Sequence, residues 1–177
     1  KFIESFILDR TLERAIEKFG VSETEIIDPT CGSGHFLLGA FERLYDHIQR
    51  QEPNLSQAQA AIQALKAVAG ADINPYAVAI AKFRLTLAYL EKSGCKKLSE
   101  APHLPLRVVV ADSLLHNPEI KQGELFVNDG ASLLARSVEL FSFEDRRATE
   151  EVLHKKYAAV VGNPPYITVK DAVLRDR

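Results

Sequence analysis

The residues with the clearest chemical potential form one tetrapeptide, Asn163-Pro164-Pro165-Tyr166. Each proline fixes its own φ and pushes the residue before it out of the α region, so the segment is predicted to be stiff and extended. A stiff loop with one amide side chain, outward carbonyl groups and a terminal aromatic ring can grip a flat group that carries an amine. A rigid turn between a strand and a helix explains the same four residues, so the rest of the chain must decide.

Polar side chains recur where predicted strands end. Short apolar runs end in Asp28, Asp72 and Asp112, and a fourth run, 157–162, leads to Asn163. Open parallel α/β sheets bind their ligands at the carboxyl ends of their strands. Packing alone does not explain why polar residues return at these positions, so the pattern predicts a site along one edge of a sheet.

A glycine-rich turn, Pro29-Thr30-Cys31-Gly32-Ser33-Gly34, separates the first of these strands from a helix. Gly32 and Gly34 allow the backbone to approach a ligand, and the N-terminus of the helix offers free amides to a carboxylate. The third glycine of a dinucleotide-binding turn is not at its spacing, because Gly39 lies too far along, so a pyrophosphate ligand is not expected. Asp28 could pair with an ammonium group or hold the loop, and both interpretations stay open.

Asp72 ends the second predicted strand, and a helix follows between Asn74 as its N-cap and Gly94 as its C-terminal stop. An acidic residue in this place suits a bidentate grip on ribose hydroxyls. The alternative is a charge that only complements the N-terminus of the helix. Asp72 lies further beyond Gly34 than the roughly 20 positions of a minimal unit, and an extra helix predicted within 46–66 accounts for the difference.

The composition is that of a globular domain, with 177 residues, 46% hydrophobic and 26% charged. A net charge of -2 argues against a self-sufficient DNA-binding domain. No apolar run is long enough for a membrane span, and no signal peptide is recognisable. Only Cys31 and Cys95 occur, which favours the reducing cytoplasm, and the five histidines lack metal-ligand spacing, so we predict no metal site.

These signals predict an α/β fold with a doubly wound, mostly parallel sheet that is truncated after the fourth strand. Both ends of the chain look cut. Four segments are expected within it, namely an amphipathic helix at 2–19, a cofactor-binding half at 25–116, an irregular or helical insert at 117–156, and a catalytic strand and loop at 157–177.

Four motifs, in this order, resemble those of gamma-class S-adenosylmethionine-dependent N6-adenine DNA methyltransferases. Residues 28–36 resemble the cofactor motif of that family, 71–75 its ribose-binding motif, 111–113 its third motif and 163–166 its catalytic motif. The resemblance implies a Rossmann-like methyltransferase fold. The amino-acid sequence of the whole stretch, including 6–12 and 169–171, is most similar to that of the PglX-type enzymes of BREX phage-defence systems.

The resemblance implies that S-adenosylmethionine is the cofactor. The turn after Asp28 would hold its methionine part, Asp72 its ribose hydroxyls and Asp112 its exocyclic amine. Ile73 would pack on the adenine ring, and Phe36 would shield the sulfonium. The complete cofactor set comprises Asp28, Pro29, Thr30, Cys31, Gly32, Gly34, Phe36, Asp72, Ile73, Asp112, Ser113 and Asn163.

The same resemblance implies a catalytic role for Asn163, Pro164, Pro165 and Tyr166. They would act in transfer of a methyl group to the N6 amine of an adenine flipped out of the duplex, in a restriction-modification or phage-defence system. Protein-glutamine and ribosomal-RNA N-methyltransferases are alternatives. A cofactor-binding module that is inactive as a fragment is another.

The partner expected from the resemblance is double-stranded DNA, bound through segments mostly missing here, because no target-recognition domain is present in this sequence. Defence-system proteins are further candidates. The strand at 157–162 would form an exposed apolar edge, which favours self-association. No membrane partner is expected, and the predicted location is the cytoplasm.

Overall fold

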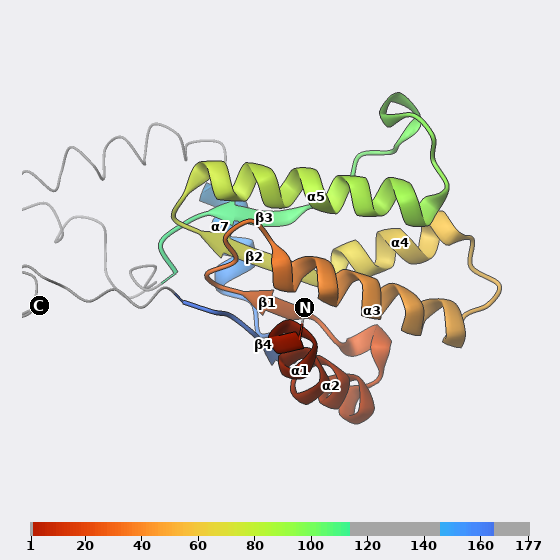
Figure 1. The fold of residues 1–177 in the computed structure, drawn as a ribbon, viewed down its shortest axis with the longest axis horizontal. Coiled ribbons are helices and arrows are strands. Elements are labelled where there is room, and N and C mark those ends of the chain that lie inside the picture. The colour runs from red at the N-terminus through yellow and green to blue at the C-terminus, as the bar shows by residue number, and fades with distance from the viewer. Residues whose placement is uncertain (1, 114–145, 165–177) are drawn as a thin grey trace, which may run out of the picture.

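The computed structural model describes residues 2–113 and 146–164. Its centre is a four-stranded sheet with the order β3-β2-β1-β4, in which every neighbouring pair is parallel (Figure 1). The predicted α/β fold is therefore confirmed. The strands are β1 (Ile26–Asp28), β2 (Val68–Asp72), β3 (Arg107–Val110) and β4 (Ala159–Val160).

The fourth strand pairs with the first, although most of the chain separates them. Ile26 lies opposite Ala159 on one side and opposite Val68 on the other. β4 is shorter than the predicted run at 157–162, but the backbone N–H of Val161 still donates to the carbonyl of Ile27 at 2.9 Å. β4 is the last strand in this order and Val160 is 61% exposed, so within the described residues β4 forms an edge that carries an exposed apolar side chain.

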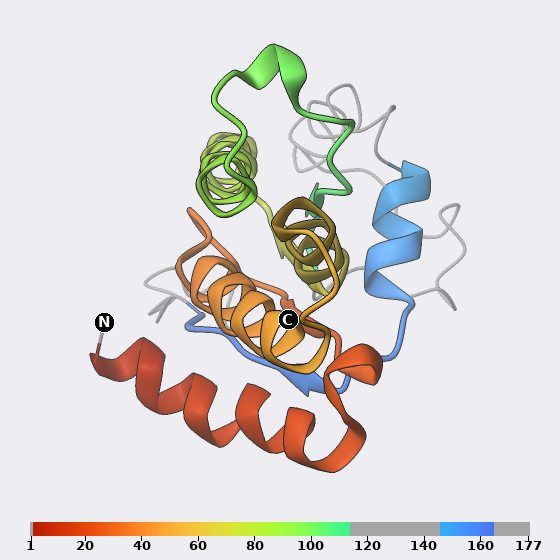
Figure 2. The same ribbon diagram turned by 90° about the vertical axis from the view of Figure 1, so that its right-hand side faces the viewer.

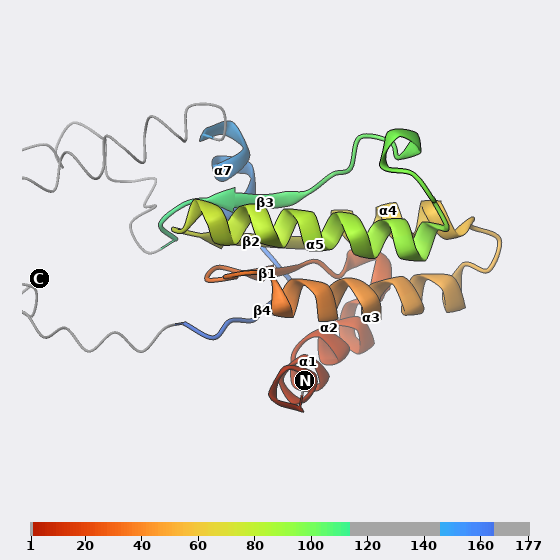
Figure 3. The ribbon, with the colours of Figure 1, turned by 45° about the horizontal axis from the view of Figure 1, so that its top comes forward.

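Successive strand residues point to opposite faces of the sheet and so belong to two separate cores. Ile26, Val68 and Val108 join a large cluster with helices α1 to α5. Ile27, Ala69 and Val109 join a smaller cluster with α7. Figures 1 and 3 show α3, α4 and α5 on one face of the sheet and α7 on the other. The bounds are α3 (His35–Gln51), α4 (Gln57–Lys66), α5 (Pro75–Ser93) and α7 (Arg146–Leu153).

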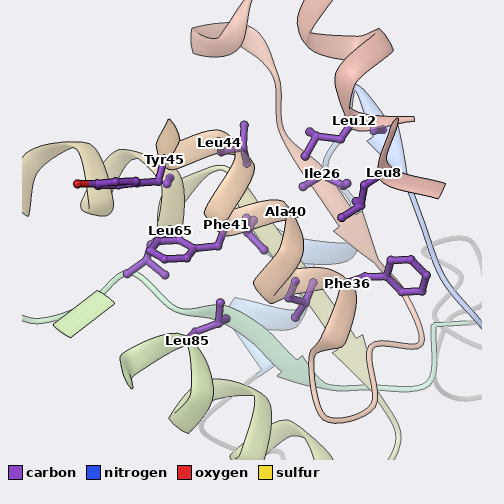
Figure 4. Close-up of a cluster of buried hydrophobic side chains, with 14 of the residues drawn as sticks. Leu8, Leu12, Ile26, Phe36, Ala40, Phe41, Leu44, Tyr45, Leu65 and Leu85 are labelled. Carbon is purple, nitrogen blue, oxygen red and sulfur yellow. The ribbon is translucent and has the colours of Figure 1, made fainter. Parts of the chain in front are cut away.

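The extra helix expected in the first crossover is α4, which lies between α3 and α5 (Figure 2). Ser56 caps it, since its hydroxyl accepts from the backbone N–H of Gln59, and the Gln59 side chain accepts from the Ser56 backbone. Ala60, Ala61 and Ala64 are fully buried. These small side chains let α4 approach its neighbours closely. In Figure 4, Leu65 of α4 lies beside Phe41 of α3 in the large core, with Leu85 of α5 nearby.

The predicted helix at 2–19 is instead two helices, α1 (Phe2–Arg10) and α2 (Leu12–Phe19). The Thr11 hydroxyl donates to the carbonyl of Ile7 at 2.7 Å, a local bond that competes with regular helix geometry. The segment was predicted to be amphipathic, and only part of its series of apolar residues is buried. Leu12, Ala15 and Ile16 are buried, whereas Phe2, Ile3, Phe6 and Phe19 are exposed.

One face of α5 is open in the described part of the chain. Phe83 is 60% and Leu87 47% exposed, while Leu85 is buried. The helix ends were predicted correctly, because Asn74 accepts from the backbone N–H of Tyr76 and Gly94 adopts a φ of 71° at the C-cap. Two short 3-10 helices, Val21–Glu23 and Leu98–Glu100, complete the elements of the described residues.

An ion-pair network ties together the amino ends of the strands. Glu25, before β1, accepts from Arg107 of β3 and from Lys155, each at 2.6 Å. Arg107 also donates to the hydroxyl of Tyr157, before β4, at 2.9 Å. Burial alone would raise the pKa of Glu25, but the bonds from Lys155 and Arg107 outweigh burial and lower it. A cavity of about 630 Å³ lies beside this network, far from the carboxyl ends of the strands.

Candidate active site

The structure brings the predicted polar residues to one edge of the sheet. Asp28 and Asp72 are the last residues of β1 and β2, and Asp112 and Asn163 follow β3 and β4. Since all four strands are parallel neighbours, their carboxyl ends meet at the same edge. Asn163 and Pro164 are exposed there. Pro165 and Tyr166, the other predicted catalytic residues, lie outside the described part of the chain.

The Asp72 carboxylate connects the two predicted cofactor motifs. One oxygen accepts from the backbone N–H of Gly32 at 2.7 Å, and the other accepts from the backbone N–H of Asn74 at 2.8 Å. The residue is half-buried, and a carboxylate that accepts one hydrogen bond at each oxygen still has unused lone pairs. Asp72 therefore holds the glycine-rich turn and the start of α5 in place, and it can still accept from a ligand hydroxyl. Ile73 beside it is 59% exposed.

Two glycines of the turn have a left-handed backbone, with φ of 53° at Gly32 and 81° at Gly34. A Cβ at Gly34 would come within 3.0 Å of the Cβ of Ala81, so the turn packs directly on α5. Arg84, one helical turn further on, donates to the Ser33 carbonyl at 2.8 Å. Arg84 did not emerge from the sequence motifs. The signal that could have found it is a cation within a mainly apolar helix.

Asp28 is the most deeply buried charged side chain of this edge, with 1% of its surface exposed. Its Oδ1 accepts from the backbone N–H of Thr30 at 3.0 Å, so Asp28 holds the loop, one of the two roles considered from the sequence. Burial raises the pKa of Asp28 to about 6, and the neighbouring Asp72 charge adds to the rise, although the bonds from Thr30 oppose it. The carboxyl group therefore titrates closer to neutral pH than an exposed aspartate.

The turn that begins at Pro29 contacts two further strand ends. Ser113, after β3, donates from its hydroxyl to the Pro29 carbonyl at 2.8 Å. Gly162, after β4, approaches so closely that a Cβ there would lie 3.1 Å from the Thr30 Oγ1. Motifs that are far apart in the sequence thus meet at one turn. Sequence reasoning did not identify Gly162 as part of the site.

Cys31 behaves as a packing residue. Its side chain is buried, and burial, with smaller contributions from Asp28 and Asp72, raises the pKa of the thiol to about 12. Such a thiol stays protonated at neutral pH and is a poor nucleophile. Phe36 is also buried, at the start of α3.

The part of the chain that the structure describes contains no group of three His, Cys, Asp or Glu side chains that could hold a metal ion. Within the same residues, no helix is long and apolar enough to cross a membrane.

Comparisons with known proteins show which family the chain resembles. Residues 66–175 match the model of the Eco57I restriction-modification methylase family. The chain is 46% identical, over 98% of its length, to the adenine-specific methyltransferase PglX of Streptomyces coelicolor, and it spans 15% of that protein. It is also 31% identical, over 54% of its length, to a putative type II restriction enzyme and methyltransferase of Methanocaldococcus jannaschii, of which it spans 9%.

The chain thus covers only a small share of each of these relatives. The resemblance found in the sequence motifs is nevertheless confirmed, and it extends over nearly the whole chain. The family match begins just before β2 and includes Asp72, Asp112 and the loop at Asn163. By this match, and by the parallel sheet that carries the motifs, the chain belongs to the Eco57I restriction-modification methylase family.

Proposed function

We propose that this chain is the cofactor-binding and catalytic part of a DNA methyltransferase that methylates the N6 amine of adenine. The observation that carries the proposal is the arrangement of Asp72, Asp28 and Asn163 at the ends of three adjacent strands, β2, β1 and β4. The first two residues hold a glycine-rich turn open to a ligand, and the third presents an exposed amide beside it. The name of the Streptomyces relative supports adenine as the methylated base.

The described residues fit S-adenosylmethionine as the cofactor. Asp72 keeps free lone pairs for ribose hydroxyls, and the exposed side chain of Ile73 offers an apolar surface to a planar ring. The backbone amides at the start of α3 suit the carboxylate of the methionine part, and Asp112 suits an exocyclic amine. When bound, the cofactor supplies an electrophilic methyl group on a sulfonium. The proposed set of cofactor-binding residues also includes Pro29, Thr30, Cys31, Gly32, Gly34, Phe36 and Ser113.

Asn163 and Pro164 would activate the target amine. The lone pair of an adenine amine is delocalised into the ring, so the amine is a poor nucleophile. The Asn163 side-chain oxygen and the Pro164 carbonyl would each accept one of its hydrogens and favour a tetrahedral nitrogen. The same two acceptors would stabilise the positive charge that develops on the nitrogen during transfer.

The remaining residues of the motif are Pro165 and Tyr166, and the role proposed for Tyr166 follows from extrusion of the base. An amine inside a duplex cannot be reached, so the adenine has to leave the stack, and Tyr166 is assigned to stack on it. Pro165 is assigned to stiffen the motif, because a proline ring fixes its own φ. Because transfer from a sulfonium needs no strong base, orientation of the amine contributes most of the rate acceleration.

Recognition of duplex DNA is assigned mostly to segments outside this chain, since its net charge of -2 offers little attraction to phosphates. We further propose that the complete enzyme works in the cytoplasm within a restriction-modification or phage-defence system. Defence-system proteins are its proposed partners. Pairing through the open edge of β4 is a route for self-association.

The experiment that tests this function uses the complete protein that contains the chain. Methyl transfer from radiolabelled S-adenosylmethionine to duplex DNA is measured beside cofactor binding by calorimetry. Asn163→Ala should abolish transfer and leave the cofactor Kd within about twofold, because the side chain acts on the amine. Label on N6-methyladenine in digested DNA supports the proposal. Label on protein or RNA, or transfer by Asn163→Ala at the native rate, contradicts it.

A further inference from the structure

Gly162 stands between β4 and Asn163, and its α-carbon faces the turn after β1. A Cβ at this position would lie 3.1 Å from the Thr30 Oγ1, 3.2 Å from the Asp28 Oδ1 and 3.9 Å from the Pro29 Cδ. The first two distances are shorter than ordinary van der Waals contact. Unlike Gly32 and Gly34, Gly162 has no positive φ that would call for glycine. The requirement for glycine here is therefore one of space.

The turn that Gly162 faces is held firmly from several sides. Within it, the Thr30 backbone donates to the Asp28 carboxylate at 3.0 Å, and Asp28 is almost fully buried. From β3, the Ser113 hydroxyl donates to the Pro29 carbonyl at 2.8 Å. From β2, the Ala71 carbonyl accepts from the Cys31 N–H at 2.9 Å. An added Cβ needs a few tenths of an ångström of extra room, and movement of this turn to provide it would strain these bonds.

The strand that carries Gly162 is also fixed up to the preceding residue. Val160 lies opposite Ile27, and the Val161 N–H donates to the Ile27 carbonyl at 2.9 Å. Beyond Val161 the chain is open to solvent at Asn163 and Pro164. The segment that would yield to an added side chain is therefore the loop at Asn163.

We propose that Gly162 is a positioning residue for methyl transfer. Its missing side chain lets the Asn163 loop lie directly against the turn of the cofactor motif. This contact sets how close the target amine comes to the methyl donor. The inference rests on the proposed function, because it needs Asn163 as the residue that holds the amine. Transfer requires reacting atoms about 3–3.5 Å apart and aligned, so a small displacement of the loop slows the chemical step.

The test measures single-turnover methyl transfer by the complete protein, because this rate reports the chemical step rather than product release. Gly162→Ala should lower the rate about tenfold and Gly162→Val about a hundredfold, because the larger side chain displaces the loop further. The cofactor Kd and the DNA Kd should stay within about twofold. Thermal unfolding of each variant confirms that it is folded, and Gly162→Ala suffices if the valine variant is not.

A substitution at Thr30 tests whether the contact between Gly162 and the Thr30 side chain causes the loss. Thr30→Ala removes the oxygen nearest to the added Cβ, so Gly162→Ala should cost clearly less in a Thr30→Ala background than in the native one. Thr30→Ser keeps that oxygen and should give no such relief. An unchanged single-turnover rate in Gly162→Ala overturns the inference. A loss that resides wholly in cofactor binding, or that is equal in all three backgrounds, also overturns it.

Asn163→Ala, measured in parallel, separates this inference from the function on which it rests. If Asn163→Ala transfers methyl groups at the native rate, the proposed function fails and the role of Gly162 fails with it. If Asn163→Ala is inactive and Gly162→Ala is fully active, the proposed function stands and only the role of Gly162 is rejected.

Discussion

The carboxylate of Asp72 accepts a hydrogen bond at 2.7 Å from the backbone of Gly32, which lies 40 positions earlier in the chain. The bond joins the end of β2 to the turn after β1. Its acceptor is charged, and such bonds are about twice as strong as neutral ones. The other Asp72 oxygen holds the N–H of Asn74, so one side chain fixes both segments.

Replacement of Asp72 should therefore affect stability as well as cofactor binding. Asp72→Ala leaves the Gly32 and Asn74 amides without this acceptor, and we expect unfolding in urea to become about 2–3 kcal/mol easier. Binding of S-adenosylmethionine in calorimetry should weaken at least tenfold. Asp46→Ala is the matched control, since Asp46 is exposed and its ion pair with Lys92 spans 3.9 Å. Equal behaviour of the two variants would contradict this double role.

Gly34 should tolerate alanine less well than Gly94 does. Both have a left-handed φ, 81° and 71°, so both variants carry the backbone cost of about 1–2 kcal/mol. A Cβ at Gly34 also collides with Ala81 at 3.0 Å, whereas at Gly94 the nearest atom is 3.9 Å away. Overpacking typically adds about 1–3 kcal/mol. Urea denaturation of Gly34→Ala and Gly94→Ala measures the difference directly, and no difference would mean that α5 moves away without cost.

Asp28 should make stability depend on pH. Its pKa in the folded protein is about 6, above the ordinary 3.8, so the folded state favours the protonated form. This contribution is full below the ordinary pKa and is lost as the pH rises through about 6, with a total of roughly 3 kcal/mol at ~1.4 kcal/mol per unit. Asp28→Asn keeps an acceptor for Thr30 and should be more stable than the native protein above pH 6. Urea denaturation of both proteins, measured from about pH 4 to about pH 7, tests this prediction. If the free energies of unfolding of the two proteins differ by a constant amount over that range, the prediction is refuted.

Arg84 should affect both the stability of the fold and the glycine-rich turn that is proposed to bind the cofactor. Arg84→Met removes the 2.8 Å bond to the Ser33 carbonyl and keeps an apolar stem of similar length. We expect unfolding to become easier by about 1.5–3 kcal/mol and the cofactor Kd to rise about tenfold. Arg147→Met is the control, because the Arg147 side chain is 92% exposed. Native cofactor affinity in Arg84→Met would show that the loop keeps its shape without this bond.

Patterns that repeat along the chain were sufficient to predict the sheet and the edge at which the candidate site residues meet. Apolar runs that end in Asp28, Asp72 and Asp112 need no tertiary information to be recognised, and neither do the caps at Asn74 and Gly94. The structure places these residues where the sequence indicated. The catalytic and cofactor-binding roles assigned to them stay predictions.

Two other features were not predictable in the same way, because one depends on a competing side-chain bond and the other on which neighbours a helix meets. Thr11 divides the first helix through a local side-chain bond that competes with helix geometry. Phe83 and Leu87 of α5 are exposed because α4 and the sheet bury its opposite side, at Leu85 and Ala81. The sequence of a largely apolar helix does not by itself determine which of its faces neighbouring elements will bury.

The pairing of β4 with β1 also has a consequence for the order of folding. Glu25 and Lys155, at the amino ends of this pair, are 130 positions apart, so their meeting closes a long loop. Closing a long loop costs entropy, and such contacts form late. On the ribosome, β1, β2 and β3 emerge and can pair before β4 has been synthesised. In the nascent chain, the strands that end at Asp28 and Asp72 and the strand before Asp112 can therefore assemble before the strand that leads to Asn163.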